Sequence, residues 1–195
     1  MNTLSWERQV TMTNKIHSIL YQLKLCKHLL PETFRSKLVT TLIYPHVDYC
    51  CAAYMDMTAE HNLKLHRAIN YCIRFIFNVK ADMHITPYYK RLRWLKIDLR
   101  RTYFVGCLLF RILRTGQPGF LHSNFNQRVL TSDRATRVSN NTLIQPQCRT
   151  ELFKRSFRVT SVRLWNGLPL SIKNAKTLND FKQRLYTHSL VCYLI

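Results

Sequence analysis

Apolar residues recur every three or four positions over most of the first 115 residues, which is the spacing of amphipathic helices. Prolines and capping residues divide this pattern into segments, with Pro31 and Pro45 as breaks and Thr58 as a helix start. Thr86 followed by Pro87 marks the start of a further short helix. The predicted helices cover residues 13–30, 31–45, 58–77 and 86–92.

The next segment, residues 99–115, is apolar on nearly all sides and is expected to be the central helix of its lobe. Asp98 is a candidate cap at its start, and Gly116 is a candidate stop at its end. At about 100° per residue, three arginines of this helix fall within an arc of about 60°. They form one narrow basic stripe: Arg100, Arg111 and Arg114.

Residues 117–142 differ in composition, with many Ser, Thr, Asn, Gly and Arg and few aliphatic side chains, which is typical of a long loop or linker. Residues 142–144 form a candidate short strand, and Thr177 is a candidate cap for a closing helix. The predicted fold is mainly α. It has a helical bundle over 1–116, a loop or linker over 117–142, and a small loop-rich C-terminal lobe over 143–195 with room for a short strand pair.

The chain carries 30 Lys and Arg against 10 Asp and Glu, a formal net charge of +20. The excess is uneven, since residues 1–87 have a net charge of +4 and residues 88–195 a net charge of +16. Such an excess favours a polyanionic partner, nucleic acid first and an anionic membrane second. The candidate phosphate-binding residues are Lys90, Arg91, Arg93, Lys96, Arg100, Arg101, Arg111, Arg114, Lys154, Arg155, Arg158 and Arg163. The alternative, that these side chains are only solvated, stays open.

Two tryptophans invite a choice between base stacking and core packing. Trp94 lies within the basic run 90–96, where an aromatic face could hold a nucleobase, so it is the stacking candidate. Trp165 lies between Leu164 and Leu168 and is predicted to be part of the core.

The seven cysteines are scattered and odd in number, which argues against a disulfide framework. No apolar signal segment opens the chain, and the uncharged stretch 102–110 is far shorter than the ~20 residues that span a bilayer. An intracellular location, cytoplasm or nucleus, is therefore expected.

His46 and Cys50 are four residues apart and are the best candidates for metal ligands, but the close cysteine pairs of zinc modules are missing. A buried thiol beside a helix histidine is the simpler interpretation. The sequence also has no Gly-x-Ser-x-Gly turn and no cysteine with a definable histidine partner. We therefore predict neither a metal site nor catalytic residues.

The most specific motif lies between residues 156 and 185, where a Trp-Asn dipeptide, a Leu-Pro turn and a short capped helix follow one another. Its residues are Ser156, Phe157, Leu164, Trp165, Asn166, Leu168, Pro169, Ile172, Lys173, Ala175, Leu178, Phe181, Lys182 and Leu185. In this order they resemble the segment that closes the reverse transcriptase polyprotein of non-LTR retrotransposons (LINE-type, Jockey/CR1-like elements).

The first half of the chain resembles the same family more loosely. The matching residues are Leu4, Trp6, Leu42, Tyr44, Pro45, Val47, Tyr49, Leu63, Leu65, Arg67, Ala68, Asn70, Arg74 and Ile76. The resemblance implies a thumb-like bundle with a connector, of the kind that grips a template–primer duplex by its backbone.

The catalytic part of that family is missing from the resemblance. Reverse transcriptases hold Mg²⁺ ions with paired palm aspartates, and this sequence has no Asp-Asp pair. Asp48 does not match the catalytic box and is interpreted as a surface acid. The resemblance thus implies a truncated fragment without the palm, which is not an enzyme and uses no cofactor.

Three hypotheses for function follow. The first is non-catalytic, sequence-independent binding to the backbone of RNA, DNA or an RNA/DNA hybrid, with the missing palm and fingers of the parent polyprotein as a further partner. The second is an inert pseudogene product whose apolar faces, around 16–30 and 44–54, favour self-association. The third is a basic helical protein–protein adaptor.

Overall fold

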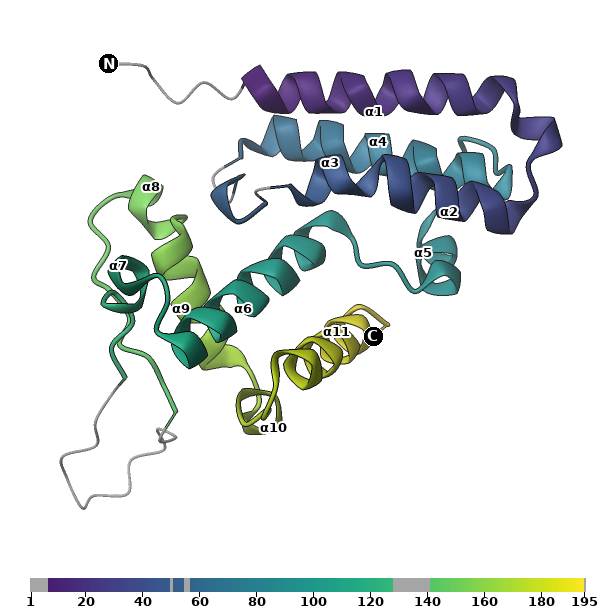
Figure 1. Cartoon of the computed structure of the whole chain (residues 1–195). Helices are drawn as coiled ribbons and strands as arrows, with labels where there is room; N and C mark the ends of the chain where they lie inside the picture. The colour runs from purple at the N-terminus through teal and green to yellow at the C-terminus, as the bar shows by residue number, and fades with distance from the viewer. Residues whose placement is uncertain (1–6, 50, 55–56, 128–140, 195) are drawn as a thin grey trace. The chain divides into compact units, whose positions relative to one another are not determined.

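The computed structural model describes residues 7–49, 51–54, 57–127 and 141–194 of the chain (Figure 1). The fold is mainly helical, which confirms the predicted class. The chain divides into two compact units, Met1–Ile97 and Asp98–Ile195, here called unit 1 and unit 2. The predicted boundary at residue 116 is therefore displaced, because the central helix belongs to the second unit.

Unit 1 is built from helices of very different lengths. They are α1 (Glu7–Leu25), η1 (Lys27–Leu29), α2 (Glu32–Leu42), α3 (Tyr44–Asp48), η2 (Cys51–Tyr54), α4 (Ala59–Phe77) and α5 (Thr86–Leu92). Helix α4 packs against both α1 and α2, and the three lie side by side (Figure 1). Its buried stripe is Leu65, Ala68, Ile69, Cys72, Ile73 and Ile76. Burial of this stripe stabilises the packing of α4 in unit 1.

The ends of the unit 1 helices follow local rules. The Thr58 hydroxyl accepts a hydrogen bond from the backbone N–H of His61, which confirms the predicted cap of α4. Asn78, in the left-handed conformation, ends that helix. Pro45 stands in the first turn of α3, so the chain breaks at Ile43 and the predicted helix 31–45 is divided. The predicted helix 13–30 ends earlier, at Leu25, and continues as the short 3-10 helix η1.

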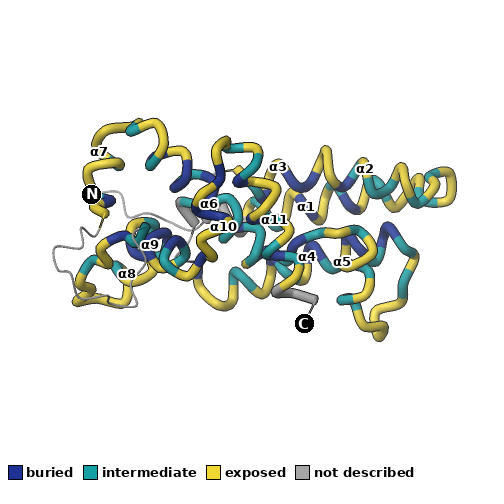
Figure 2. Tube along the Cα trace, turned by 90° about the horizontal axis from the view of Figure 1, so that it is seen from below, coloured by how far each residue is buried: buried dark blue, intermediate teal, exposed yellow. Residues whose placement is uncertain are grey.

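Unit 2 is helical over most of its described length. Its helices are α6 (Ile97–Thr115), α7 (Gly119–His122), α8 (Glu151–Lys154), α9 (Phe157–Gly167), α10 (Leu170–Lys173) and α11 (Leu178–Leu194). Gly116, with φ of 67°, ends α6 as predicted. Figure 2 shows mostly exposed residues on α7 and α8 and buried residues along α9.

The core of unit 2 joins α6, α9 and α11. The rings of Phe110 and Phe181 stack with centroids 4.2 Å apart, and Trp165 is buried beside Phe181, as predicted for a core residue. At Gly106 the helices approach closely, because a Cβ atom there would lie 2.8 Å from Cδ2 of Leu185. Only glycine fits this position without displacing Leu185.

Two expectations for the C-terminal lobe need correction. The lobe is not loop-rich, since α8 to α11 occupy most of residues 151–194. The helix of residues 157–167 was missed because its buried positions, Val159, Val162 and Trp165, are separated by many polar side chains. Within the described residues the strand pair is reduced to one isolated antiparallel bridge between Gln127 and Leu143.

Candidate nucleic-acid interface

The predicted phosphate-binding residues are divided between the two units. Unit 1 holds Lys90, Arg91, Arg93 and Lys96 together with Trp94, and unit 2 holds the other eight. Each set is therefore considered within its own unit.

The unit 1 set lies at and just after the end of α5, where several of its members serve the fold. Arg91 donates from Nη2 to Oε1 of Glu32 at 2.8 Å, and its guanidinium carbon lies 4.9 Å from the centroid of the Phe77 ring. These contacts hold α5 against α2 and α4. Arg93 is exposed and ends α5 in the left-handed conformation, with φ of 54°. Arg91 thus makes contacts within the fold, and its role as a phosphate ligand stays a prediction.

Trp94, the predicted stacking residue, is half-buried and packs edge-on against the ring of Tyr44, with centroids 4.8 Å apart and planes at 87°. The contact ties the end of α5 to α3. Because this ring is committed to packing, base stacking by Trp94 has no support from the geometry and stays a prediction.

The three arginines of the α6 stripe differ in their contacts. Arg114 donates from Nη2 to the backbone oxygens of Ala175 at 2.8 Å and Lys176 at 3.3 Å, and it also lies over the Phe110 ring. Arg100 lies over the ring of Phe104, whereas Arg111 is exposed. Arg114 therefore fixes the connection between α10 and α11. Arg101, the fourth predicted arginine of this helix, is buried.

A group of five exposed cations lies on α8, α9 and their flanks. It consists of Arg149, Lys154, Arg155, Arg158 and Arg163, here called the α8–α9 cationic segment, and all five residues are exposed. Glu151 is the acidic residue within this stretch. It forms an ion pair of 3.0 Å with Lys154, and both side chains are exposed to solvent. Such exposed pairs are worth little. Four of these exposed residues were predicted as phosphate ligands, which stays a prediction. Arg149 was not predicted, although its proximity to them in the sequence could have been used as a signal.

Further cations on α10 and α11 were not predicted. Lys176 and Lys182 are exposed, and Arg184 pairs with Asp180 at 2.6 Å and with the backbone oxygen of Ser171. Lys173 is buried, with only 5% of its surface exposed. Burial lowers the pKa of its ammonium, because a charge is costly away from water.

The Trp-Asn dipeptide of the C-terminal motif has a structural role. The indole Nε1–H of Trp165 donates to the backbone oxygen of Asn141 at 3.1 Å. Asn166 exchanges two hydrogen bonds with the backbone of Leu143, each of 2.9 Å. Together they hold the chain around residue 143 against α9, which places this motif in the core of unit 2.

The cysteines and histidines are the residues that bear on metal binding and nucleophilic catalysis. The described part of the chain contains no group of three His, Cys, Asp or Glu side chains that could hold a metal ion. Cys50, one of the two candidate ligands, lies outside the described residues. Cys51 and Cys72 are buried, and burial raises the pKa of Cys72 to about 12. Such a thiol is a poor nucleophile.

Among the described residues, no helix combines the length and the apolar character needed to cross a bilayer. Comparison with models of protein families, with curated proteins and with solved structures finds no match to this chain.

Proposed function

We propose that this chain binds nucleic acid through the phosphate backbone, without sequence preference and without catalysis of its own, and that unit 2 carries most of the binding. The observation that carries the proposal is the number of exposed cations in the α8–α9 cationic segment. The proposal includes the ancestry implied by the motif of residues 156–185, a fragment of a non-LTR retrotransposon reverse transcriptase.

The charge of unit 2 supports a polyanionic partner. Its described residues include thirteen Lys and Arg but only three Asp and Glu. Three carboxylates can neutralise only a small part of that charge, so the remainder must be balanced by solvent ions or by a bound polyanion. Releasing condensed counterions from nucleic acid is the usual source of affinity for such surfaces.

The type of side chain points to phosphate more than to bases. Four of the five residues of the α8–α9 cationic segment are arginines, whose guanidinium groups match the oxygens of a phosphate with two parallel hydrogen bonds. Phosphate contacts carry no sequence information by themselves. We therefore expect similar affinity for RNA, DNA and RNA/DNA hybrids of any sequence.

Charge reversal tests the proposal. The double variant Arg158→Glu/Arg163→Glu removes two exposed cations of the segment, and Lys15→Glu/Lys37→Glu makes the same change of net charge at exposed positions of unit 1. Binding of labelled duplexes is followed by fluorescence anisotropy over a range of salt concentrations. The first variant should bind all sequences more weakly and reduce the slope of log affinity against log salt by about 0.9 per lost phosphate contact. Equal affinities for the two double variants would refute the role of the segment.

Two further observations would test the remaining parts. Purified protein should extend no primer on an RNA template with Mg²⁺ or Mn²⁺, because the sequence lacks paired metal-binding aspartates. In the genome, the DNA upstream of the reading frame should contain a palm-coding stretch, intact or frameshifted. An unrelated upstream sequence would count against the ancestry.

A second candidate function, a protein–protein adaptor, is favoured by one specific surface. Tyr21, Leu25 and Leu29 follow one another at intervals of four residues at the end of α1 and in η1, and they are 66%, 62% and 73% exposed. Apolar side chains this exposed and this close together are typical of interaction sites.

A further inference from the structure

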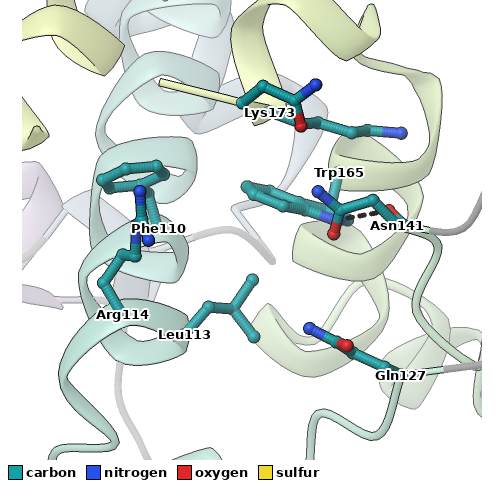
Figure 3. Close-up of a pocket in the computed structure, with 8 residues that line it drawn as sticks. Phe110, Leu113, Arg114, Gln127, Asn141, Trp165 and Lys173 are labelled. Carbon is teal, nitrogen blue, oxygen red and sulfur yellow. Dashed lines mark hydrogen bonds between the residues drawn. The ribbon is translucent and has the colours of Figure 1, made fainter. Parts of the chain in front are cut away.

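A cavity of about 360 Å³ lies inside unit 2, beside the motif that contains Trp165 (Figure 3). Its wall is formed by Phe110, Leu113 and Arg114 of α6, Trp165 of α9, Lys173 and Asn174 at the end of α10, and Gln127 and Asn141. A cavity of this size falls at the lower end of the range for small-molecule sites. It is separate from the exposed arginines proposed to bind the nucleic-acid backbone.

Among the described residues of this wall, the charged groups are cationic. They are Arg114 and Lys173, and no described carboxylate lines the cavity. Arg114 is occupied by the backbone oxygens of residues 175 and 176. The hydrogen-bonding capacity of Lys173 is used less fully. Its ammonium carries three hydrogens, and within the described residues it makes one hydrogen bond, to the backbone oxygen of Asn166 at 3.3 Å.

The desolvated ammonium of Lys173 would be stabilised by an anion. Lys173 and Trp165 line the same cavity (Figure 3), and only 5% of Lys173 is exposed. A buried cation with one long hydrogen bond to a neutral acceptor is poorly compensated, which agrees with the lowered pKa of this group.

The polar residues of the wall add further donors. The side-chain amides of Gln127, Asn141 and Asn174 line the cavity, and their N–H₂ groups are potential donors to a ligand. Leu113 and the Trp165 ring supply an apolar part of the wall. The site therefore offers many donors around one cation, next to a surface that suits a flat, apolar group.

We propose that this cavity binds a phosphate monoester of mononucleotide size, with the phosphate at Lys173 and the amides, and the planar part against the apolar wall. A phosphate has several acceptor oxygens and uses a surplus of donors better than a carboxylate does. The phosphate could belong to a free nucleotide or to the 5′ end of a strand. The inference does not depend on the proposed function.

Calorimetric titration of the full chain tests the proposal. Adenosine 5′-monophosphate should bind and adenosine should not, and the variant Lys173→Met, which keeps the length of the side chain, should lose affinity about tenfold, as expected for one charged hydrogen bond. The control Lys176→Met removes an exposed cation three residues away and should leave binding unchanged. Equal binding of adenosine and its monophosphate, or unaltered affinity in Lys173→Met, would overturn the site.

Two further arms complete the design. If Lys173→Met does not fold, Gln127→Leu and Asn174→Ala change exposed wall residues and should each weaken binding several-fold. Single strands with a 5′ phosphate or a 5′ hydroxyl are then tested as competitors of adenosine 5′-monophosphate. Competition by the 5′-phosphate strand alone would assign the site to strand ends. Competition by neither strand would assign it to free nucleotides. Equal competition by both strands would contradict the site. Lys173→Met should retain duplex binding, and Arg158→Glu/Arg163→Glu should retain mononucleotide binding. Failure of the cavity proposal can therefore be distinguished from failure of the proposed binding to the nucleic-acid backbone.

Discussion

The side-chain amide of Asn166 is paired with the backbone of Leu143. The Leu143 N–H donates to Oδ1 of Asn166, Nδ2 of Asn166 donates to the Leu143 carbonyl, and both distances are 2.9 Å. One amide side chain thus satisfies both backbone polar groups of the buried residue Leu143, as a neighbouring strand would. The pairing joins residues 23 positions apart and fixes the segment that precedes α8.

Replacing this amide by a carboxylate should destabilise unit 2. In Asn166→Asp the Leu143 carbonyl loses its donor and faces a negative charge, which should lower the free energy of unfolding by about 1–3 kcal/mol. Urea denaturation followed by circular dichroism measures the change. Asn14→Asp, an exposed position on α1, is the matched control and should change stability little. Equal stability of the two variants would show that the pairing contributes nothing.

The arginines of α6 should separate by role. Arg114→Glu removes the bonds to the backbone oxygens of Ala175 and Lys176 and should lower unfolding free energy by about 2 kcal/mol. Arg111→Glu, three residues earlier and exposed, should leave stability almost unchanged. Thermal melts of both variants distinguish the roles, and similar melting temperatures would mean that the Arg114 contacts are dispensable.

The cysteines should react at very different rates. Cys26 and Cys148 are exposed, whereas Cys72 is buried and burial raises the pKa of its thiol to about 12. With a chromogenic disulfide reagent, Cys26→Ser should therefore remove one thiol from the fast phase and Cys72→Ser none. Loss of a fast thiol in Cys72→Ser would mean that α4 opens readily.

The raised pKa of Cys72 should also make the stability of the fold depend on pH. Above the ordinary pKa of 9.0 the unfolded chain releases this proton while the folded chain retains it, so unfolding becomes easier as pH rises from about 9 to 12. Cys72→Ala should be less stable than the parent near neutral pH, because it leaves a cavity. That difference should narrow above pH 9. A difference that stays constant from pH 8 to 10 would contradict the assignment.

Self-association is expected through the exposed stripe of Tyr21, Leu25 and Leu29. Leu25→Glu places a charge in the middle of the stripe and should shift the sedimentation profile toward monomer. Gln22→Glu, exposed on the same helix, makes a similar addition of charge outside the stripe and should not. A parent chain that is already monomeric at high concentration would refute the expectation.

Local chemistry predicted some helix ends but not the long-range contacts. Thr58 and Gly116 act as predicted because a cap or a stop depends on residues within one turn. The contacts of Arg114 could not be predicted, because its acceptors lie 61 and 62 positions further along the chain. An arginine on an exposed helix face looks the same in sequence whether it meets solvent, phosphate or a distant carbonyl.

The burial of Lys173 illustrates the same difficulty. Helix α10 is a single turn, too short for a periodic pattern, so nothing in the sequence showed which of its side chains point inward. The boundary between the two units could not be predicted either. The sequence of α6 is apolar on nearly all sides, so it does not show which neighbouring helices α6 packs against. In contrast, Trp165 was predicted to be part of the core and is buried.

Because α6 and α11 approach closely at Gly106, the size of the side chain at this position controls the spacing between the two helices. Each added methyl group must be accommodated by moving Leu185, which is fully buried and has little room to turn. A series from Gly to Ala, Ser and Val would thus push the two helices apart in small steps without altering any charge. The ring stacking of Phe110 on Phe181, one turn further along α6, would report each step.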